Sequence, residues 1–151
     1  MLVKDIMTSD VVTVKPTMGV QELAQLFVEK EISGAPVVDD KGALRGVVLE
    51  ESLILQDKNI HLPTFFFILS GFITLGEHQF EEEMKKVAST NVEGIMERAP
   101  KTLSPDTPVE DVATLIVEHG VHYFPVVEAG KLVGVVTKKD LVRAIAQKKI
   151  W

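Results

Sequence analysis

The sequence has no cysteine among its 151 residues. A disulfide framework, a thiol nucleophile and a thiolate metal site are therefore excluded. Basic residues are in the minority, since 16 Lys and Arg stand against 22 Asp and Glu, which gives a formal net charge of −6. Nucleic acids and anionic membrane surfaces attract concentrated positive charge, so this balance argues against both as partners.

Uninterrupted apolar runs are scarce as well. Near the N-terminus, Lys4 and Asp5 interrupt the apolar residues that a secretion signal would need, which predicts a cytoplasmic protein. The apolar stretch at residues 65–75 is broken by Ser70, Gly71 and Thr74 and falls short of the ~20 apolar residues of a membrane span. With 46% hydrophobic and 25% charged residues, the composition is that of a globular protein.

The chain contains an internal sequence repeat of two copies. Residues 3–7, Val-Lys-Asp-Ile-Met, recur as Val-Glu-Gly-Ile-Met at 92–96, and Pro-Val-Val-Asp at 36–39 recurs as Pro-Val-Val-Glu at 125–128. Further aligned pairs are Thr13 with Thr102, Pro16 with Pro105, Leu26 with Leu115 and, after one deletion, Gly46 with Gly134. Matches of this number with a single gap indicate an internal duplication.

Each copy is predicted to form a short extended piece, a helix, two short strands and a second helix. Alternating and continuous apolar patterns place the strands at residues 35–38, 44–49, 124–127 and 132–136, and the last helix at 139–149. In the second copy, Thr107 is the expected N-cap and Pro108 the first helical residue. Gly120 is expected to end that helix, which separates His119 from His122 and argues against a shared metal.

The segment from Gly134 to Asp140, Gly-Val-Val-Thr-Lys-Lys-Asp, passes from a buried strand to a helix N-terminus. Free backbone N–H groups at such a point favour anions, and an ionised carboxylate accepts hydrogen bonds from two vicinal hydroxyls, as in a ribose. The same spacing is also that of a capping box, in which Thr137 and Asp140 satisfy the first N–H groups of the helix. Both interpretations stay open, and one residue can serve both.

These motifs, together with Ser33-Gly-Ala-Pro-Val-Val-Asp39, resemble a tandem pair of cystathionine-β-synthase (CBS) domains, often called a Bateman module. The resemblance implies an α/β (α+β) fold of two β-α-β-β-α repeats, packed face to face about a pseudo-twofold axis. Repeat 1 would cover residues 1–55 and repeat 2 residues 92–151. A helical linker with an apolar run would occupy residues 56–91.

The resemblance implies a regulatory module without catalysis or a required cofactor. Its ligand would be an adenosyl compound (AMP, ADP, ATP or S-adenosylmethionine) in the cleft between the repeats. By resemblance, the ligand-binding residues are Val12, Thr13, Ile32, Ser33, Gly34, Ala35, His122, Thr137, Lys139 and Asp140. The first repeat has Leu49 and Ser52 in place of Thr137 and Asp140. We therefore expect a weak or vacant second site around Val121, His122, Tyr123 and Ser52.

An alternative function is that of a structural interaction protein. CBS pairs commonly form homodimers, and the linker holds Phe65, Phe66, Phe67, Phe72 and Phe80. Large exposed apolar patches mark interfaces, so this linker could dock a protein partner while the pocket stays unoccupied. No catalytic or metal-binding constellation is evident in the sequence, so an enzyme is not expected.

Overall fold

The computed structural model describes residues 1–54 and 90–147. Each copy of the repeat supplies one two-stranded sheet, β1 (Gly34–Val38) with β2 (Leu44–Leu49) and β3 (Tyr123–Glu128) with β4 (Lys131–Thr137). The helices are α1 (Val3–Ile6), α2 (Val20–Lys30), α3 (Glu50–Ile54), α6 (Val92–Ile95), α7 (Val109–His119) and α8 (Lys138–Ala146). The mixed α/β class and the repeated strand pairs confirm the predicted fold class. The expected linker helices lie outside the described residues.

The chain forms two compact units. One contains described residues of Met1–Val12, Asp40–Leu44 and Ala99–Trp151, and we call it the α8 unit. The other contains described residues of Thr13–Asp39 and Arg45–Arg98, and we call it the α2 unit. The units differ from the two sequence repeats, because the opening segment of each repeat belongs to the unit that holds the other repeat's sheet.

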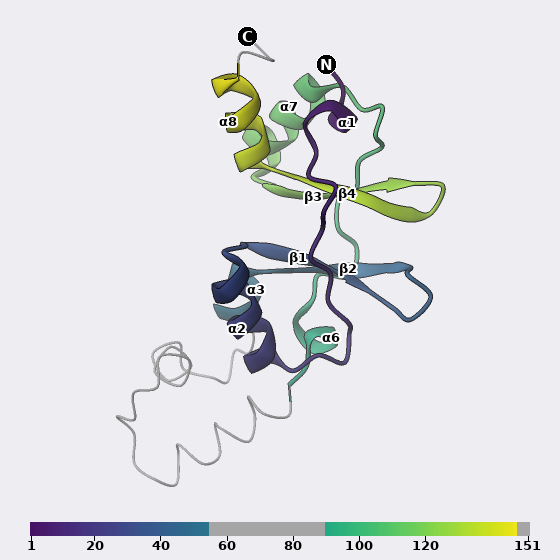
Figure 1. Cartoon of the computed structure of the whole chain (residues 1–151), viewed down its shortest axis with the longest axis vertical. Helices are drawn as coiled ribbons and strands as arrows, with labels where there is room; N and C mark the ends of the chain where they lie inside the picture. The colour runs from purple at the N-terminus through teal and green to yellow at the C-terminus, as the bar shows by residue number, and fades with distance from the viewer. Residues whose placement is uncertain (55–89, 148–151) are drawn as a thin grey trace, which may run out of the picture. The chain divides into compact units, whose positions relative to one another are not determined.

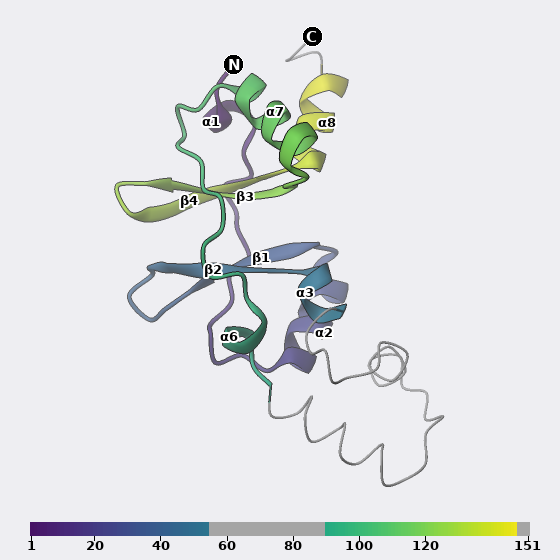
Figure 2. The same cartoon turned by 180° about the vertical axis from the view of Figure 1, so that it is seen from behind.

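Each unit has its own apolar core. In the α8 unit, α1, α7 and α8 cover one face of the β3–β4 sheet, as both views show (Figures 1 and 2). Val3 and Ile6 of α1 are buried there with Val112 and Phe124. The α2 unit repeats the arrangement, with α2, α3 and α6 on one face of β1–β2. The periodic apolar residues of the sequence therefore supply both cores.

The ends of α7 differ in how well the sequence predicts them. Gly120 ends the helix with φ 66°, the left-handed conformation that glycine adopts without strain, so that prediction is confirmed. The predicted N-cap is wrong by one residue, because Pro108 is the N-cap and Val109 the first helical residue. Thr107 caps a preceding turn instead, where its hydroxyl oxygen accepts a hydrogen bond of 3.1 Å from the Ser104 N–H.

The chain after α1 pairs with the middle of β4. Thr8 exchanges backbone hydrogen bonds with Val135, at 2.9 Å from the Thr8 N–H and 3.0 Å from the Val135 N–H. Gly134 permits this approach, because a Cβ at that position would lie 2.8 Å from Met7 Sδ and 2.9 Å from the Thr8 carbonyl oxygen. The N-terminal segment thus acts as a short extra strand beside the last strand of the chain.

The α2 unit shows the same pairing. Glu97, which follows α6, exchanges backbone hydrogen bonds with Val47 of β2. Gly46 stands where Gly134 stands in the other unit, and a Cβ there would meet the Glu97 carbonyl oxygen. The glycine that recurs in both copies is therefore explained by a backbone approach.

Candidate functional site

Asp140 is a buried carboxylate at the N-terminus of α8, with a side chain 3% exposed. Its Oδ2 accepts hydrogen bonds from the backbone N–H of Thr137 at 2.8 Å and from the Thr137 hydroxyl at 3.2 Å. Thr137 is the N-cap of α8 and forms a capping box with Asp140. The capping interpretation of the Thr-x-x-Asp spacing is therefore confirmed.

The other carboxylate oxygen has two further donors. The Thr8 hydroxyl donates to Asp140 Oδ1 at 2.9 Å, and Arg143 Nη1 donates to the same oxygen at 2.9 Å. A carboxylate offers about four acceptor positions, so the protein itself occupies all of them. Any ligand that binds this carboxylate must displace at least one of these donors.

Tyr123 lies on the strand beside this cluster. It pairs with Thr137 across the β3–β4 sheet and is 7% exposed. Burial raises the pKa of the Tyr123 phenol above its usual value, and the negative charge of Asp140 raises it further. Among residues 1–54 and 90–147, the phenol hydroxyl has no hydrogen-bond partner. Within this part of the chain, a phenol hydroxyl without a partner thus lies close to the buried carboxylate.

The CBS domain family matches this chain twice, at residues 3–58 and 92–147. The chain belongs to the CBS domain family. The match covers both copies of the internal repeat, so the chain is a tandem CBS pair, as the sequence motifs predicted.

Two sequence relatives and one solved structure extend this result. Protein MJ1426 of Methanocaldococcus jannaschii is 31% identical over 154 residues, which cover 96% of this chain and 91% of that protein. The chloroplastic CBS domain-containing protein CBSX2 of Arabidopsis thaliana is 34% identical over 140 residues, which cover 90% of this chain and 59% of CBSX2. The crystal structure of CBSX2 in complex with AMP superimposes with a TM-score of 0.74 at 32% identity, covering 99% of this chain and 98% of that one.

The ligand residues predicted for this CBS pair are divided between the two units. The α8 unit holds Thr137 and Asp140, which are hydrogen-bonded, together with half-buried Val12 and His122 and exposed Lys139. The α2 unit holds exposed Thr13 and Ser33, half-buried Ile32 and buried Gly34 and Ala35. Of these residues, the structure brings Thr137 and Asp140 into one hydrogen-bonded group. The roles of the others stay predictions.

Sequence reasoning missed Thr8 and Arg143. The spacing of Arg143 from Asp140 permits an ion pair along one helix face, so a search for oppositely charged residues three apart could have found it. No local pattern identifies Thr8, because its contact depends on the pairing of the N-terminal segment with β4.

The first CBS repeat differs at the matching positions. The Ser52 hydroxyl oxygen accepts a hydrogen bond of 3.0 Å from the Leu49 N–H, as Asp140 does from Thr137. Ser52 thus takes over the capping role but supplies no carboxylate. Glu97 occupies the backbone position that Thr8 has in the other unit. The expected weakness of the second site, around Val121, Tyr123 and Ser52, stays a prediction.

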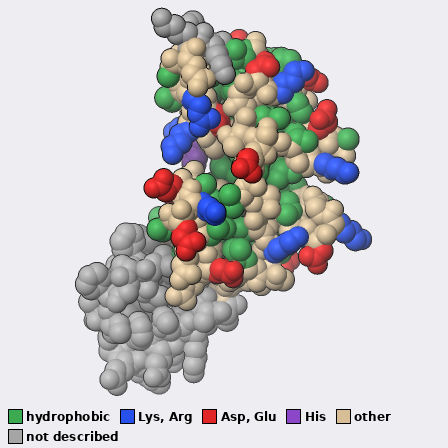
Figure 3. All heavy atoms as spheres, viewed as in Figure 1, with side chains coloured by type: hydrophobic (Ala, Val, Ile, Leu, Met, Phe, Trp, Pro, Cys, Tyr) green, Lys and Arg blue, Asp and Glu red, His purple; other side chains and the backbone are tan. Residues whose placement is uncertain are grey.

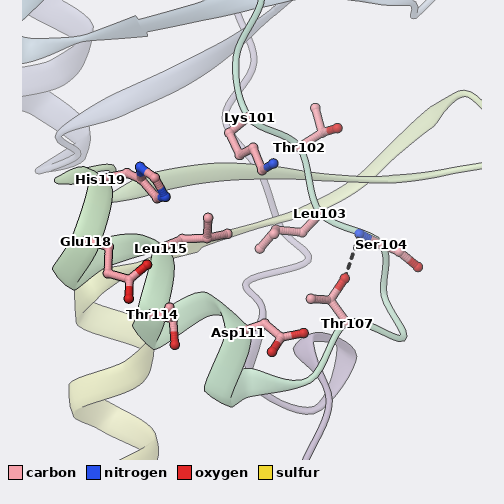
Figure 4. A pocket seen from close by; sticks show the side chains of 10 residues that line it. All are labelled: Lys101, Thr102, Leu103, Ser104, Thr107, Asp111, Thr114, Leu115, Glu118 and His119. Atoms are coloured by element: carbon pink, nitrogen blue, oxygen red, sulfur yellow. Dashed lines mark hydrogen bonds between the residues drawn. The ribbon is translucent and has the colours of Figure 1, made fainter.

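The α8 unit also contains a shallow hollow of about 410 Å³ between α7 and the segment before it (Figure 4). Its walls carry side chains of both charges, including Lys101, Asp111 and Glu118, and they share no residue with the Asp140 cluster. Within the described residues, no group of three or more His, Asp or Glu side chains could hold a metal ion. The same residues include no helix with the length and hydropathy needed to cross a membrane.

Proposed function

We propose that this CBS pair is a regulatory module that binds an adenosyl ligand, with Asp140 gripping the ribose. The observation that carries the proposal is the buried Asp140 carboxylate, which is held by four donors at the start of α8. These donors hold the two carboxylate oxygens in a set orientation, which a ribose hydroxyl can use once it displaces one donor. The AMP complex of CBSX2, at 32% identity over nearly the whole chain, supports the same ligand class.

Binding proceeds by exchange of donors. A ribose hydroxyl replaces one of the protein donors on Oδ1, while the Thr137 N–H and hydroxyl keep Oδ2 in place. The remaining ligand contacts proposed for this site are those of Val12, Thr13, His122, Lys139 and the segment from Ile32 to Ala35. The ligand regulates by shifting the chain between two conformations. It favours the conformation that binds it more tightly, by an amount set by the difference in its affinity for the two. In this function the chain catalyses no reaction.

Thermal shift with AMP, ADP, ATP and S-adenosylmethionine tests the proposal. A ligand at 100 times its Kd should add about 2.7 kcal/mol to the free energy of unfolding. Asp140→Asn should remove most of that shift. Asp111→Asn, an exposed carboxylate of the hollow beside α7, is the control and should leave it unchanged. A melting temperature unmoved by all four compounds, or an undiminished shift in Asp140→Asn, would overturn the proposal.

Exposed apolar side chains favour a second candidate, an interaction protein that forms a homodimer. Val28 of α2 is 78% exposed and Val117, at the matching position of α7, is 83% exposed. Ile54 and Val142 form another matched and exposed pair. Contiguous exposed apolar surface marks interaction sites, and a homodimer could cover these side chains as part of such a surface. Sedimentation should then show a dimer that Val117→Glu weakens, with or without any ligand. A monomeric wild-type chain would exclude this candidate.

A further inference from the structure

The ion pair between Arg143 and Asp140 joins two side chains of unequal exposure. Arg143 Nη1 lies 2.9 Å from Asp140 Oδ1, and the Arg143 side chain is 54% exposed while the carboxylate is 3% exposed. Among the described residues, the guanidinium makes no other hydrogen bond. Arg143 is therefore the exposed partner of a buried carboxylate.

The four donors to Asp140 differ in how easily they can leave. The Thr137 N–H belongs to the backbone at the start of α8, and its hydroxyl shares the capping box. Thr8 is held by two backbone hydrogen bonds to Val135. Within residues 1–54 and 90–147, the only hydrogen bond of the Arg143 side chain is the one to Asp140, and water can solvate the exposed guanidinium once it leaves. Water can compensate the exposed guanidinium for the lost ion pair, and a ligand hydroxyl can replace it on the buried carboxylate, so Arg143 is the donor that a ligand displaces at least cost.

Positive charge is concentrated where α8 begins. Lys138 and Lys139 are exposed in its first turn, and Figure 3 shows Lys and Arg side chains gathered over this part of the molecule. Cations in a first helical turn oppose the helix dipole. Together with Arg143 they outnumber the one carboxylate of α8, although the whole chain has a net charge of −6. A bound anion would relieve this local excess.

We infer that Arg143 is a specificity-determining residue: it leaves Asp140 when ribose hydroxyls bind and pairs with a phosphate of the same ligand. The phosphate and the hydroxyls are carried by one sugar ring, so the displaced guanidinium remains close to the anion. The site is then selective for phosphorylated nucleosides such as AMP over neutral adenosine and the cationic S-adenosylmethionine. This inference rests on the proposed adenosyl site.

Calorimetric titration of the full chain with AMP, adenosine and S-adenosylmethionine tests it. The wild type should bind AMP about tenfold or more tightly than adenosine, the factor expected of one charge-assisted hydrogen bond. In Arg143→Gln this ratio should fall to within about threefold, while adenosine binds at least as tightly as before because no ion pair must break. Arg143→Lys keeps the charge and should retain part of the preference for AMP.

Arg98→Gln, an exposed arginine of the α2 unit, is the matched control and should keep the wild-type ratio. If Arg143→Gln binds ligands but keeps the wild-type ratio, or weakens AMP and adenosine equally, the inference is wrong while the adenosyl site stands. If the wild type binds none of the three compounds, both the site and the inference fail. A wild type that prefers S-adenosylmethionine to AMP would overturn the selectivity alone.

Discussion

The Thr8 hydroxyl donates a hydrogen bond of 2.9 Å to Oδ1 of Asp140, and so joins positions 132 residues apart in the chain. Thr8 lies in the opening segment of the first CBS repeat, whereas Asp140 lies in the last helix of the second. The carboxylate proposed to hold the ribose is thus oriented partly by a residue outside its own repeat. This arrangement makes Thr8 a positioning residue for the site.

Replacement of Thr8 by valine tests that role, because valine keeps the shape and removes the hydroxyl. Loss of one donor to a charged acceptor should lower the free energy of unfolding by about 1.5 kcal/mol and weaken AMP binding. Urea unfolding and calorimetry measure the two effects. Thr8→Ser restores the hydroxyl and should recover both. Valine and serine variants with equal affinity for AMP would show that the hydroxyl does not position the carboxylate.

Replacement of Gly134 by alanine should displace the N-terminal segment. The new Cβ would lie 2.8 Å from Met7 Sδ and 2.9 Å from the Thr8 carbonyl oxygen, so overpacking should cost about 1–3 kcal/mol in urea unfolding. AMP binding should weaken as well, since Thr8 moves away from Asp140. Gly94→Ala is the control, because its nearest contact would be an ordinary 3.6 Å to Thr90. Equal stability of the two variants would contradict the close approach.

The raised pKa of the Tyr123 phenol predicts that the free energy of unfolding decreases in alkaline solution. Its pKa is raised above the ordinary 10.0 by burial and by Asp140, so the folded protein keeps the phenol proton at a pH where the unfolded chain loses it. The unfolded state then binds fewer protons, and the free energy of unfolding falls as the pH rises above about 10. Below that pH the contribution is fully present.

The chain has one tyrosine, so the tyrosinate absorbance reports Tyr123 alone. The absorbance should rise only above the ordinary pKa, together with unfolding. Tyr123→Phe should remove the phenol's share of the alkaline slope. At neutral pH it should be as stable as the wild type, because the hydroxyl has no partner among the described residues. A tyrosinate signal that appears near pH 10 in the folded protein would contradict the prediction.

The strand pairs were predictable because their signals are local. Continuous valines and the turns with Gly42 and Gly130 indicate hairpins, and β2 spans the predicted residues 44–49. The start of α7 was not predictable at one-residue precision. The Thr107 hydroxyl could cap either the first turn of α7 or the preceding turn. In the structure it accepts a hydrogen bond from the Ser104 N–H and so caps the preceding turn. The residue type identifies a capping side chain, but it does not determine which of the neighbouring backbone N–H groups that side chain will accept from.

The amino-acid sequence by itself determined the duplication, the two hairpins and the capping spacing of Thr137 and Asp140, because each depends on residues close in the chain or on direct repetition. The tertiary structure alone decided that Thr8 completes the Asp140 cluster. It also showed that position 134 must lack a side chain because the N-terminal segment passes close to its backbone. The physical reason is that strand pairing brings together residues of any separation, and the hydrogen bonds that follow leave no periodic trace in the sequence.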